Sequence, residues 1–185
     1  MNPLLTDPVT GMLNRMGLIS AIAGESGKWR ALFLDLVGFG DFERYSEGDR
    51  KLADAARAIH KAVTSEFPSR TLLFCRWGGD EFLILMSPSL SGDFGIPAED
   101  DDLGIVAGER EADGVRYRFA TREILLDDAY PKSLIELPKK VTNGESPLFQ
   151  IQVNASDVYA FLVSVVDDLY ERILSLKRAR AGDRG

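Results

Sequence analysis

The sequence predicts a mixed α/β domain of the α+β class, in which helices cover a central sheet. Along residues 1–86, segments with helical and strand patterns follow in the order helix, strand, helix, hairpin. The predicted strands are continuously apolar, which indicates burial on both faces of the sheet. A segment with strong helical character closes the chain from residue 156 onward.

Each element of the first half follows from a local pattern. A first helix is expected to begin at Thr6 or Asp7, either of which can cap it, and to end before the glycines of 24–27. Apolar runs of strand length, apolar side chains at helical spacing and a Gly-Gly turn signal then define the next elements. These elements are a strand at 31–37, a helix at 49–67, and a hairpin with strands 71–75 and 82–86.

The second half gives weaker patterns. Residues 87–102 are rich in turn-forming and acidic residues and are expected to form a loop. Two short β-prone runs flank the turn signal Asp113-Gly114 and predict a second hairpin, with strands 104–107 and 115–120. The segment 121–137 remains ambiguous between helix and strand.

Composition is typical of a globular domain with one core. The chain has 185 residues, of which 45% are hydrophobic, so a single domain over 1–185 is the default. A single Cys excludes an intramolecular disulfide framework. The sequence lacks both a bilayer-spanning run and a signal-peptide pattern, so we expect a cytoplasmic protein without a membrane partner. The net charge of −7, from 29 acidic and 22 basic residues, disfavours a nucleic acid polymer as partner.

The stretch CRWGGDEFLIL, residues 75–85, places two carboxylates at the tip of the first predicted hairpin. Asp80 and Glu81 would repel each other there, and a bound cation, a shifted pKa or solvent exposure relieves such repulsion. A third carboxylate, Asp35, interrupts the apolar run 31–37, where an unpaired charge is costly. If that strand lies beside the hairpin, the three carboxylates form a site suited to Mg²⁺ or Mn²⁺, which indicates phosphoryl or nucleotidyl transfer. The alternative is a solvated turn that merely makes the bend.

Several motifs resemble those of one family, in the same order along the chain. They are DPVTGMLNR at 7–15, LDLVGFGDF at 34–42, Gly48 with Asp49 and Leu52, and RWGGDEF at 76–82. In these segments the chain resembles the GGDEF domains, which are diguanylate cyclases. The resemblance implies a palm-like nucleotide-cyclase fold with a central, mostly antiparallel sheet flanked by helices. It is dense from residue 7 to about residue 86 and thin over a divergent segment at about 87–150.

The resemblance also implies roles for individual residues. Asp35, the backbone carbonyl of Leu36 and Asp80 would bind the metal. Glu81, together with Asp80, would serve catalysis by helping to activate the attacking 3′-hydroxyl. Asp49 would accept hydrogen bonds from the edge of guanine. The implied nucleotide-binding positions are, as a group, Phe39, Gly40, Glu43, Asp49, Lys177 and Arg180.

Some of these positions depart from the family's pattern. Gly40 replaces a Lys that contacts phosphate, and Glu43 replaces an Asn that contacts guanine. Near the end of the chain, Ile173 stands at the position of a further Lys in the simplest register. Lys177 and Arg180 are therefore the candidates for phosphate contacts in the closing helix.

Three further residues are expected to have structural roles. Arg76, beside the signature, is expected to pair with a nearby carboxylate, and Trp77 to pack in the core rather than stack on a base. The lone His60 lies among polar neighbours on a predicted helix and is interpreted as a surface residue.

Two functions of different classes follow from the resemblance. In the first, two protomers each hold one GTP with Mg²⁺ or Mn²⁺ and form a transient homodimer. Each 3′-hydroxyl then attacks the partner's α-phosphate, which closes cyclic di-GMP, with weak or altered activity. In the second, the chain is a degenerate, inactive nucleotide-binding or signalling module. A variant of the first is a related cyclase that uses a nucleotide with a different base.

Overall fold

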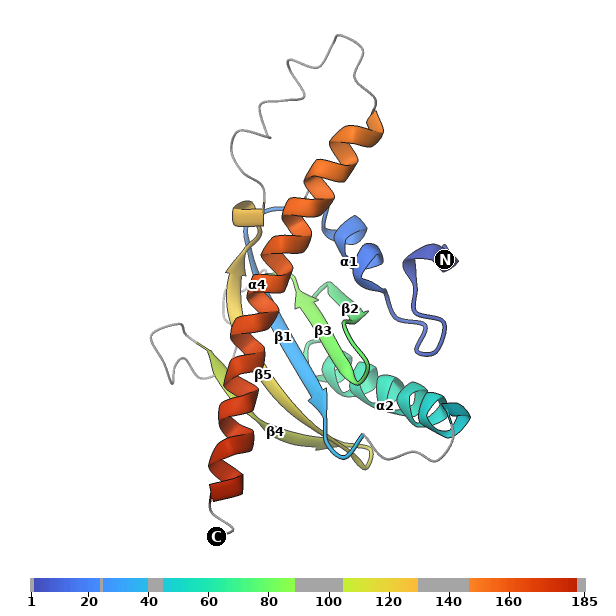
Figure 1. The fold of residues 1–185 in the computed structure, drawn as a ribbon, viewed down its shortest axis with the longest axis vertical. Coiled ribbons are helices and arrows are strands. Elements are labelled where there is room, and N and C mark those ends of the chain that lie inside the picture. Colours follow the sequence, from blue (N-terminus) through green and yellow to red (C-terminus); the bar gives the residue numbers. More distant parts are fainter. Residues whose placement is uncertain (1, 24, 40–44, 89–104, 130–146, 183–185) are drawn as a thin grey trace.

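The computed structural model describes residues 2–23, 25–39, 45–88, 105–129 and 147–182. These residues form three layers, with a central sheet between one helix on one side and two on the other (Figure 1). None of the helices in this part of the chain combines the length and the apolar character needed to cross a membrane.

The sheet has five strands, and every neighbouring pair is antiparallel. In spatial order they are β2 (Leu72–Arg76), β3 (Glu81–Met86), β1 (Lys28–Leu36), β5 (Val115–Leu125) and β4 (Val106–Ala112). The predicted α+β class with a central antiparallel sheet is confirmed. Both predicted hairpins are also present, as β2–β3 and β4–β5.

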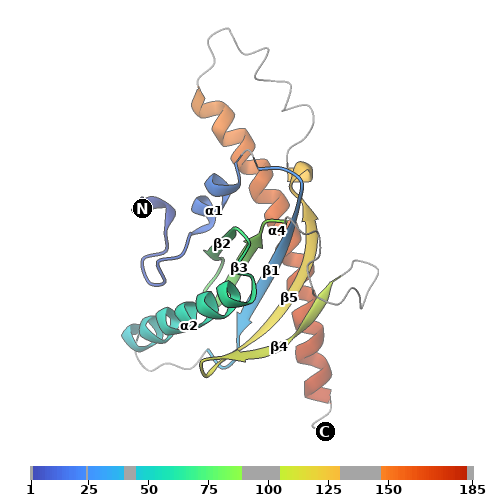
Figure 2. The ribbon, with the colours of Figure 1, turned by 180° about the vertical axis from the view of Figure 1, so that it is seen from behind.

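The helices cover opposite faces of this sheet. Helices α1 (Arg15–Ile22) and α4 (Pro147–Gly182) pack on one face, and α2 (Tyr45–Glu66) packs on the other. Figure 1 shows α4 crossing the sheet along its length, and Figure 2 shows α2 from the opposite side. Two short 3₁₀ helices, η1 (Pro3–Leu5) and η2 (Leu126–Ala129), lie before α1 and after β5.

Strand β1 contributes to both cores because alternate side chains point to opposite faces. Phe33 faces α1 and α4, its neighbour Leu34 faces α2, and both are fully buried. Continuous apolar character in this strand therefore does indicate burial on both faces, as predicted. The same alternation directs the side chain of Asp35 to the face covered by α4.

The predicted starts of three helices are wrong. Helix α1 begins at Arg15 rather than at Thr6 or Asp7, because Asn14 caps it: the Asn14 side chain accepts a hydrogen bond from the Gly17 N–H at 2.8 Å. The side chain of Asp7 could also cap a helix, but it accepts a hydrogen bond from the Thr10 N–H and stabilises the turn 7–11, in which Gly11 has a φ of 71°.

Helices α2 and α4 both begin earlier than predicted. Helix α2 begins at Tyr45, so the predicted start at residue 49 is about one turn too late. Helix α4 begins at Pro147 instead of residue 156, and proline is well tolerated in the first turn of a helix.

The second hairpin is longer than expected. Its turn residues Asp113 and Gly114 both have positive φ, 48° and 79°, as a two-residue hairpin turn with this sequence requires. Strand β5 extends to Leu125 and accounts for the start of the ambiguous segment 121–137, and η2 follows it. Residues 89–104, which include most of the expected loop, lie outside the described residues, as do 130–137.

Candidate functional site

Four charged residues form one row across the sheet, on the face that α4 covers. Glu81 of β3 pairs with Asp35 of β1, Asp35 pairs with Arg118 of β5, and Arg118 pairs with Glu109 of β4. Directly opposed residues in antiparallel strands have neighbouring side chains on the same face. The sheet register therefore brings Asp35 beside the signature, as the sequence predicted, and beside an arginine that it did not predict.

Asp35 is held by two cations from different elements. The side chain of Asp35 is only 9% exposed, and its Oδ1 and Oδ2 lie 3.1 and 2.9 Å from Lys177 Nζ. Arg118 Nη1 donates to Oδ2 at 3.2 Å. These contacts account for a charge in an otherwise apolar strand, because a buried carboxylate is tolerated when it is paired.

The signature turn brings its two carboxylates next to Asp35. The N–H of Leu36 donates to the carbonyl oxygen of Asp80 at 3.2 Å, and the N–H of Trp77 donates to that of Glu81 at 2.9 Å. The Glu81 carboxylate folds back against Gly78, where a Cβ atom would collide with it. Gly78 thus leaves space for the Glu81 side chain.

Burial and mutual repulsion disfavour the charged forms of both signature carboxylates. The pKa of Asp80 is raised by burial and by the charge of Asp35, against the opposing charges of Lys177 and Arg76. The pKa of Glu81 is raised by burial and by the charges of Asp80 and Asp35. A cation bound among these three carboxylates would offset that repulsion.

The residues present fit a hard divalent cation. The carboxylates of Asp35 and Asp80 and the carbonyl of Leu36 are oxygen donors of the kind that Mg²⁺ and Mn²⁺ prefer. Within the described residues, no group of three or more His, Cys, Asp or Glu side chains is already gathered around a point that could hold a metal ion. Instead, Lys177 and Arg118 neutralise the Asp35 carboxylate.

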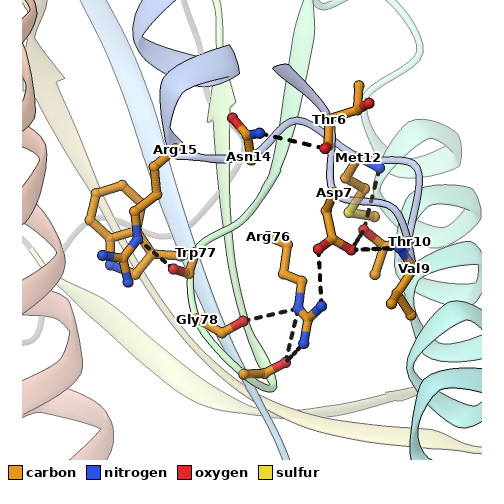
Figure 3. A network of polar contacts seen from close by, with 11 residues as sticks. Thr6, Asp7, Val9, Thr10, Met12, Asn14, Arg15, Arg76, Trp77 and Gly78 are labelled. Carbon is orange, nitrogen blue, oxygen red and sulfur yellow. Dashed lines mark hydrogen bonds and ion pairs between the residues drawn. The ribbon is translucent and has the colours of Figure 1, made fainter. Parts of the chain in front are cut away.

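A clamp formed by Arg76 fixes the shape of the signature turn (Figure 3). The Arg76 guanidinium donates to the carbonyl oxygens of Gly78 and Gly79 at 2.8 to 3.1 Å, and its Nη1 lies 3.0 Å from Asp7 Oδ2. The other oxygen of Asp7 accepts from the N–H and the hydroxyl of Thr10, both at 2.8 Å. The predicted carboxylate partner of Arg76 is therefore Asp7, which joins the DPVTGMLNR motif to the GGDEF signature.

A second contact joins the signature to α1 and α4. Trp77 is 7% exposed and stacks on Tyr159 of α4, with ring centroids 6.2 Å apart. Arg15 of α1 lies over the Trp77 ring, donates to the Trp77 carbonyl at 2.6 Å and donates to the Tyr159 hydroxyl at 3.1 Å. Trp77 thus packs in the core, as predicted.

Acidification should remove the stabilisation that Asp7 provides. Burial alone would raise the pKa of Asp7, but hydrogen bonds from Thr10 and the charge of Arg76 outweigh burial and lower it. A carboxylate with a lowered folded pKa stabilises the fold above its unfolded pKa, and this contribution is lost as the pH falls through the folded pKa. We expect Asp7→Asn to lower the free energy of unfolding by about 1–3 kcal/mol near neutral pH. This difference should shrink below about pH 4.

Denaturant unfolding from about pH 7 to about pH 3 measures this difference. The control is Asp54→Asn, because Asp54 forms an exposed ion pair with Arg57 in the same helix. A destabilisation by Asp7→Asn that is the same at both ends of the pH range would contradict the role assigned to Asp7.

The other predicted nucleotide-binding residues are placed as follows. Asp49 is exposed near the start of α2, and Phe39 is half-buried against the core between α2 and the sheet. Lys177 reaches the Asp35 carboxylate, whereas Ile173 is fully buried in the core. Gly40, Glu43 and the side chain of Arg180 lie outside the described residues.

The remaining prediction concerned His60. It is exposed on α2, as predicted, and its ring lies 4.4 Å from that of Phe74 between the ring centroids.

Sequence reasoning missed Arg118 and the roles of Asp7 and Arg15. A signal for Arg118 exists, since a charged residue within a predicted strand requires a partner when that face is buried. Only the register between β1 and β5 identifies the partner as Asp35. Asp35 and Arg118 are 83 residues apart in the sequence, so no local pattern contains this information.

Comparisons with known proteins point to one family. Residues 4–93 match the family model described as "Diguanylate cyclase, GGDEF domain". A comparison with curated proteins gave no match.

Solved structures of GGDEF proteins are similar to the chain. The diguanylate cyclase SiaD of Pseudomonas aeruginosa, solved in complex with its activator SiaC, is 22% identical with a TM-score of 0.42; the match covers 83% of this chain and 57% of that one. A sensory box/GGDEF family protein of Caulobacter crescentus is 22% identical with a TM-score of 0.35, over 67% and 85% of the two chains. The GGDEF domain of FimX from Pseudomonas aeruginosa is 17% identical with a TM-score of 0.38, over 84% and 94%.

The matched segment contains the two motifs that Asp7 and Arg76 join, as well as Asp35, Asp80 and Glu81. Residues 4–93, just under half of the chain, therefore match the GGDEF domain family.

Proposed function

We propose that the chain is a diguanylate cyclase that condenses two GTP molecules into cyclic di-GMP with a divalent metal. The observation that carries this proposal is the pairing of Asp35 with Glu81 next to Asp80, at the signature turn of the family. Three carboxylates at one end of a rigid sheet suit nucleotidyl transfer, in which protein groups position a metal-bound triphosphate and accept a proton.

The residues of the chain would divide this chemistry among them. Asp35, Asp80 and the Leu36 carbonyl would hold Mg²⁺ or Mn²⁺, which stabilises negative charge developing on the phosphates. Glu81 would accept the proton of the 3′-hydroxyl. The 3′-oxygen would then bond to the α-phosphorus of the other GTP, and the bond between that phosphorus and pyrophosphate would break. A raised pKa suits Glu81 to this task, because a base whose pKa lies nearer to neutral pH accepts a proton more readily. Asp49 would accept hydrogen bonds from guanine.

Each product requires two nucleotide sites that face each other, so the proposal includes a transient homodimer. We therefore expect the rate per protomer to rise with protein concentration, because assembly of two protomers precedes the reaction. Incubation of a dilution series with GTP and Mg²⁺, with cyclic di-GMP resolved by chromatography, measures this dependence. A rate per protomer that is constant over a wide range of concentrations would contradict the shared-site mechanism.

The base specificity is tested by the same assay with labelled GTP, ATP, CTP and UTP presented separately. GTP should be consumed, with cyclic di-GMP and pyrophosphate as products. A cyclic product from another nucleotide would support the variant in which the chain is a related cyclase with a different base choice.

A second candidate function is a nucleotide-binding module without turnover. The pairing of Asp35 with both Lys177 and Arg118 favours it, because these cations compete with a metal for the same carboxylate. The loss of the Lys at Gly40 and of the Asn at Glu43 favours it as well. Binding of GTP without any product in the assay above would support this candidate.

A further inference from the structure

We infer that Arg118 is a phosphate-binding residue of the nucleotide site. This inference rests on the proposed function, since it assigns one more residue to the same site. Arg118 lies in β5, outside the residues 4–93 that match the family model. Within the matched segment, Gly40 stands at a position where the resemblance implies a phosphate-contacting Lys.

The register of the sheet places Arg118 beside the carboxylate of Asp35. Arg118 lies directly opposite Asp35, and Asp35 lies opposite Glu81, so the three side chains are adjacent on one face. Arg118 Nη1 lies 3.2 Å from Asp35 Oδ2, and Lys177 Nζ lies 2.9 Å from the same oxygen. A phosphate bound beside the Asp35 carboxylate would therefore be within reach of both cations.

The guanidinium of Arg118 has donors left for an oxyanion. A guanidinium carries five N–H donors in a planar fork that matches phosphate oxygens. Within the described part of the chain, Nη1 donates to Asp35, whereas the buried Nε makes no hydrogen bond and has Glu109 Oε2 at 3.8 Å. The side chain is 20% exposed, so little desolvation remains to be made when a phosphate binds.

The charges of the site also favour a phosphate-binding role for Arg118. Asp35, Asp80 and Glu81 together repel a triphosphate, and a divalent metal offsets only part of that repulsion. Arg118 and Lys177 add two positive charges at the Asp35 carboxylate. Arg118 and Lys177 would leave their ion pair with Asp35 if a metal neutralised this carboxylate, and they could then bind the phosphates.

Arg122 offers a matched control on the same strand and the same face. It pairs with Asp168 of α4 at 2.8 Å, and its side chain is 18% exposed, close to the value for Arg118. Its Nε also lacks a hydrogen bond within the residues described. Arg122→Gln therefore removes an equally buried, ion-paired arginine without touching Asp35.

The test is binding of GTP, ATP and inorganic triphosphate, each with Mg²⁺, to the whole chain, measured by isothermal titration calorimetry. Arg118→Gln should weaken the binding of all three ligands by the same factor, about 10-fold to 100-fold, because a contact with phosphate does not depend on the base. Arg118→Lys should keep the fold and lose less affinity than Arg118→Gln, since lysine keeps the positive charge but not the planar set of N–H donors. Arg122→Gln should bind all three as the wild type does. Circular dichroism and thermal unfolding check the fold of each variant.

Four outcomes would overturn the inference. Unchanged affinity in Arg118→Gln would show that Arg118 does not contact the phosphates. Weaker binding of GTP alone would show that Arg118 contacts the base. Tighter binding of the ligands to Arg118→Gln would show that Arg118 competes with the metal for Asp35. If Arg122→Gln weakened ligand binding as much as Arg118→Gln, the effect would come from the loss of any half-buried arginine on this face and not from a contact of Arg118. Failure of the wild type to bind any of the three ligands would instead contradict the proposed function itself.

Discussion

Asp80→Asn should abolish metal-dependent nucleotide binding while leaving the fold intact. Asp80 is one of two carboxylates that would hold the metal, and its amide analogue keeps the shape but loses the charge. Partners that merely orient a metal ligand contribute about 10–100-fold in affinity, so removal of a ligand itself should cost about 100-fold or more. Titration of GTP in the presence and absence of Mg²⁺ measures this loss.

The fold should survive because the charge of Asp80 does not stabilise it. A raised pKa means that the folded state disfavours the ionised form, so neutralising this residue should leave the thermal midpoint unchanged or raise it. Asp113→Asn is a suitable control, since Asp113 is exposed in the β4–β5 turn and asparagine also tolerates its positive φ. Metal-dependent binding that persists in Asp80→Asn would contradict the proposed metal site.

The parts of the site that were predictable are those encoded by local patterns. The Gly-Gly turn between two apolar runs identifies the hairpin tip, and Asp35 is conspicuous because it interrupts a buried strand. Pairing of β1 with β3 then follows from the hydrophobicity of both strands, which must be buried in the centre of the sheet.

The parts that were not predictable depend on register between distant segments. Arg118 meets Asp35 only because β5 pairs with β1 in one particular register, and a shift of one residue would turn the Arg118 side chain to the opposite face. Asp7 and Arg76 are also distant in sequence, and either could have paired elsewhere.

Helix boundaries failed for a different physical reason. Asp7 and Asn14 both have side chains that can cap a helix, and the sequence does not state which one does. Asp7 is engaged by the turn 7–11 and by Arg76, which leaves Asn14 to begin α1. At the end of the chain, the helical pattern was predicted correctly. Ile173, which the resemblance aligns with a Lys, is buried in the core, and Lys177 reaches Asp35 instead.

Glu81→Gln should separate chemistry from binding. Glu81 lies beside Asp35 in the sheet but would not hold the metal, so its amide should leave GTP affinity within a few-fold of the wild type. Turnover should fall by about 10²–10⁴-fold, the usual contribution of a positioned general base. Gln keeps the contact with Gly78, and the backbone hydrogen bonds to the Glu81 carbonyl do not involve its side chain, so the turn should keep its shape.

The comparison of Glu81→Gln with Asp80→Asn makes the division of roles testable. Titration of GTP and the rate of cyclic di-GMP formation are measured for both variants, with Glu111→Gln on the exposed part of β4 as the control. The expected result is loss of turnover alone in Glu81→Gln and loss of both binding and turnover in Asp80→Asn. Equal loss of binding in the two variants would make Glu81 a further metal ligand. Full turnover in Glu81→Gln would mean that the 3′-hydroxyl loses its proton to another group, such as solvent.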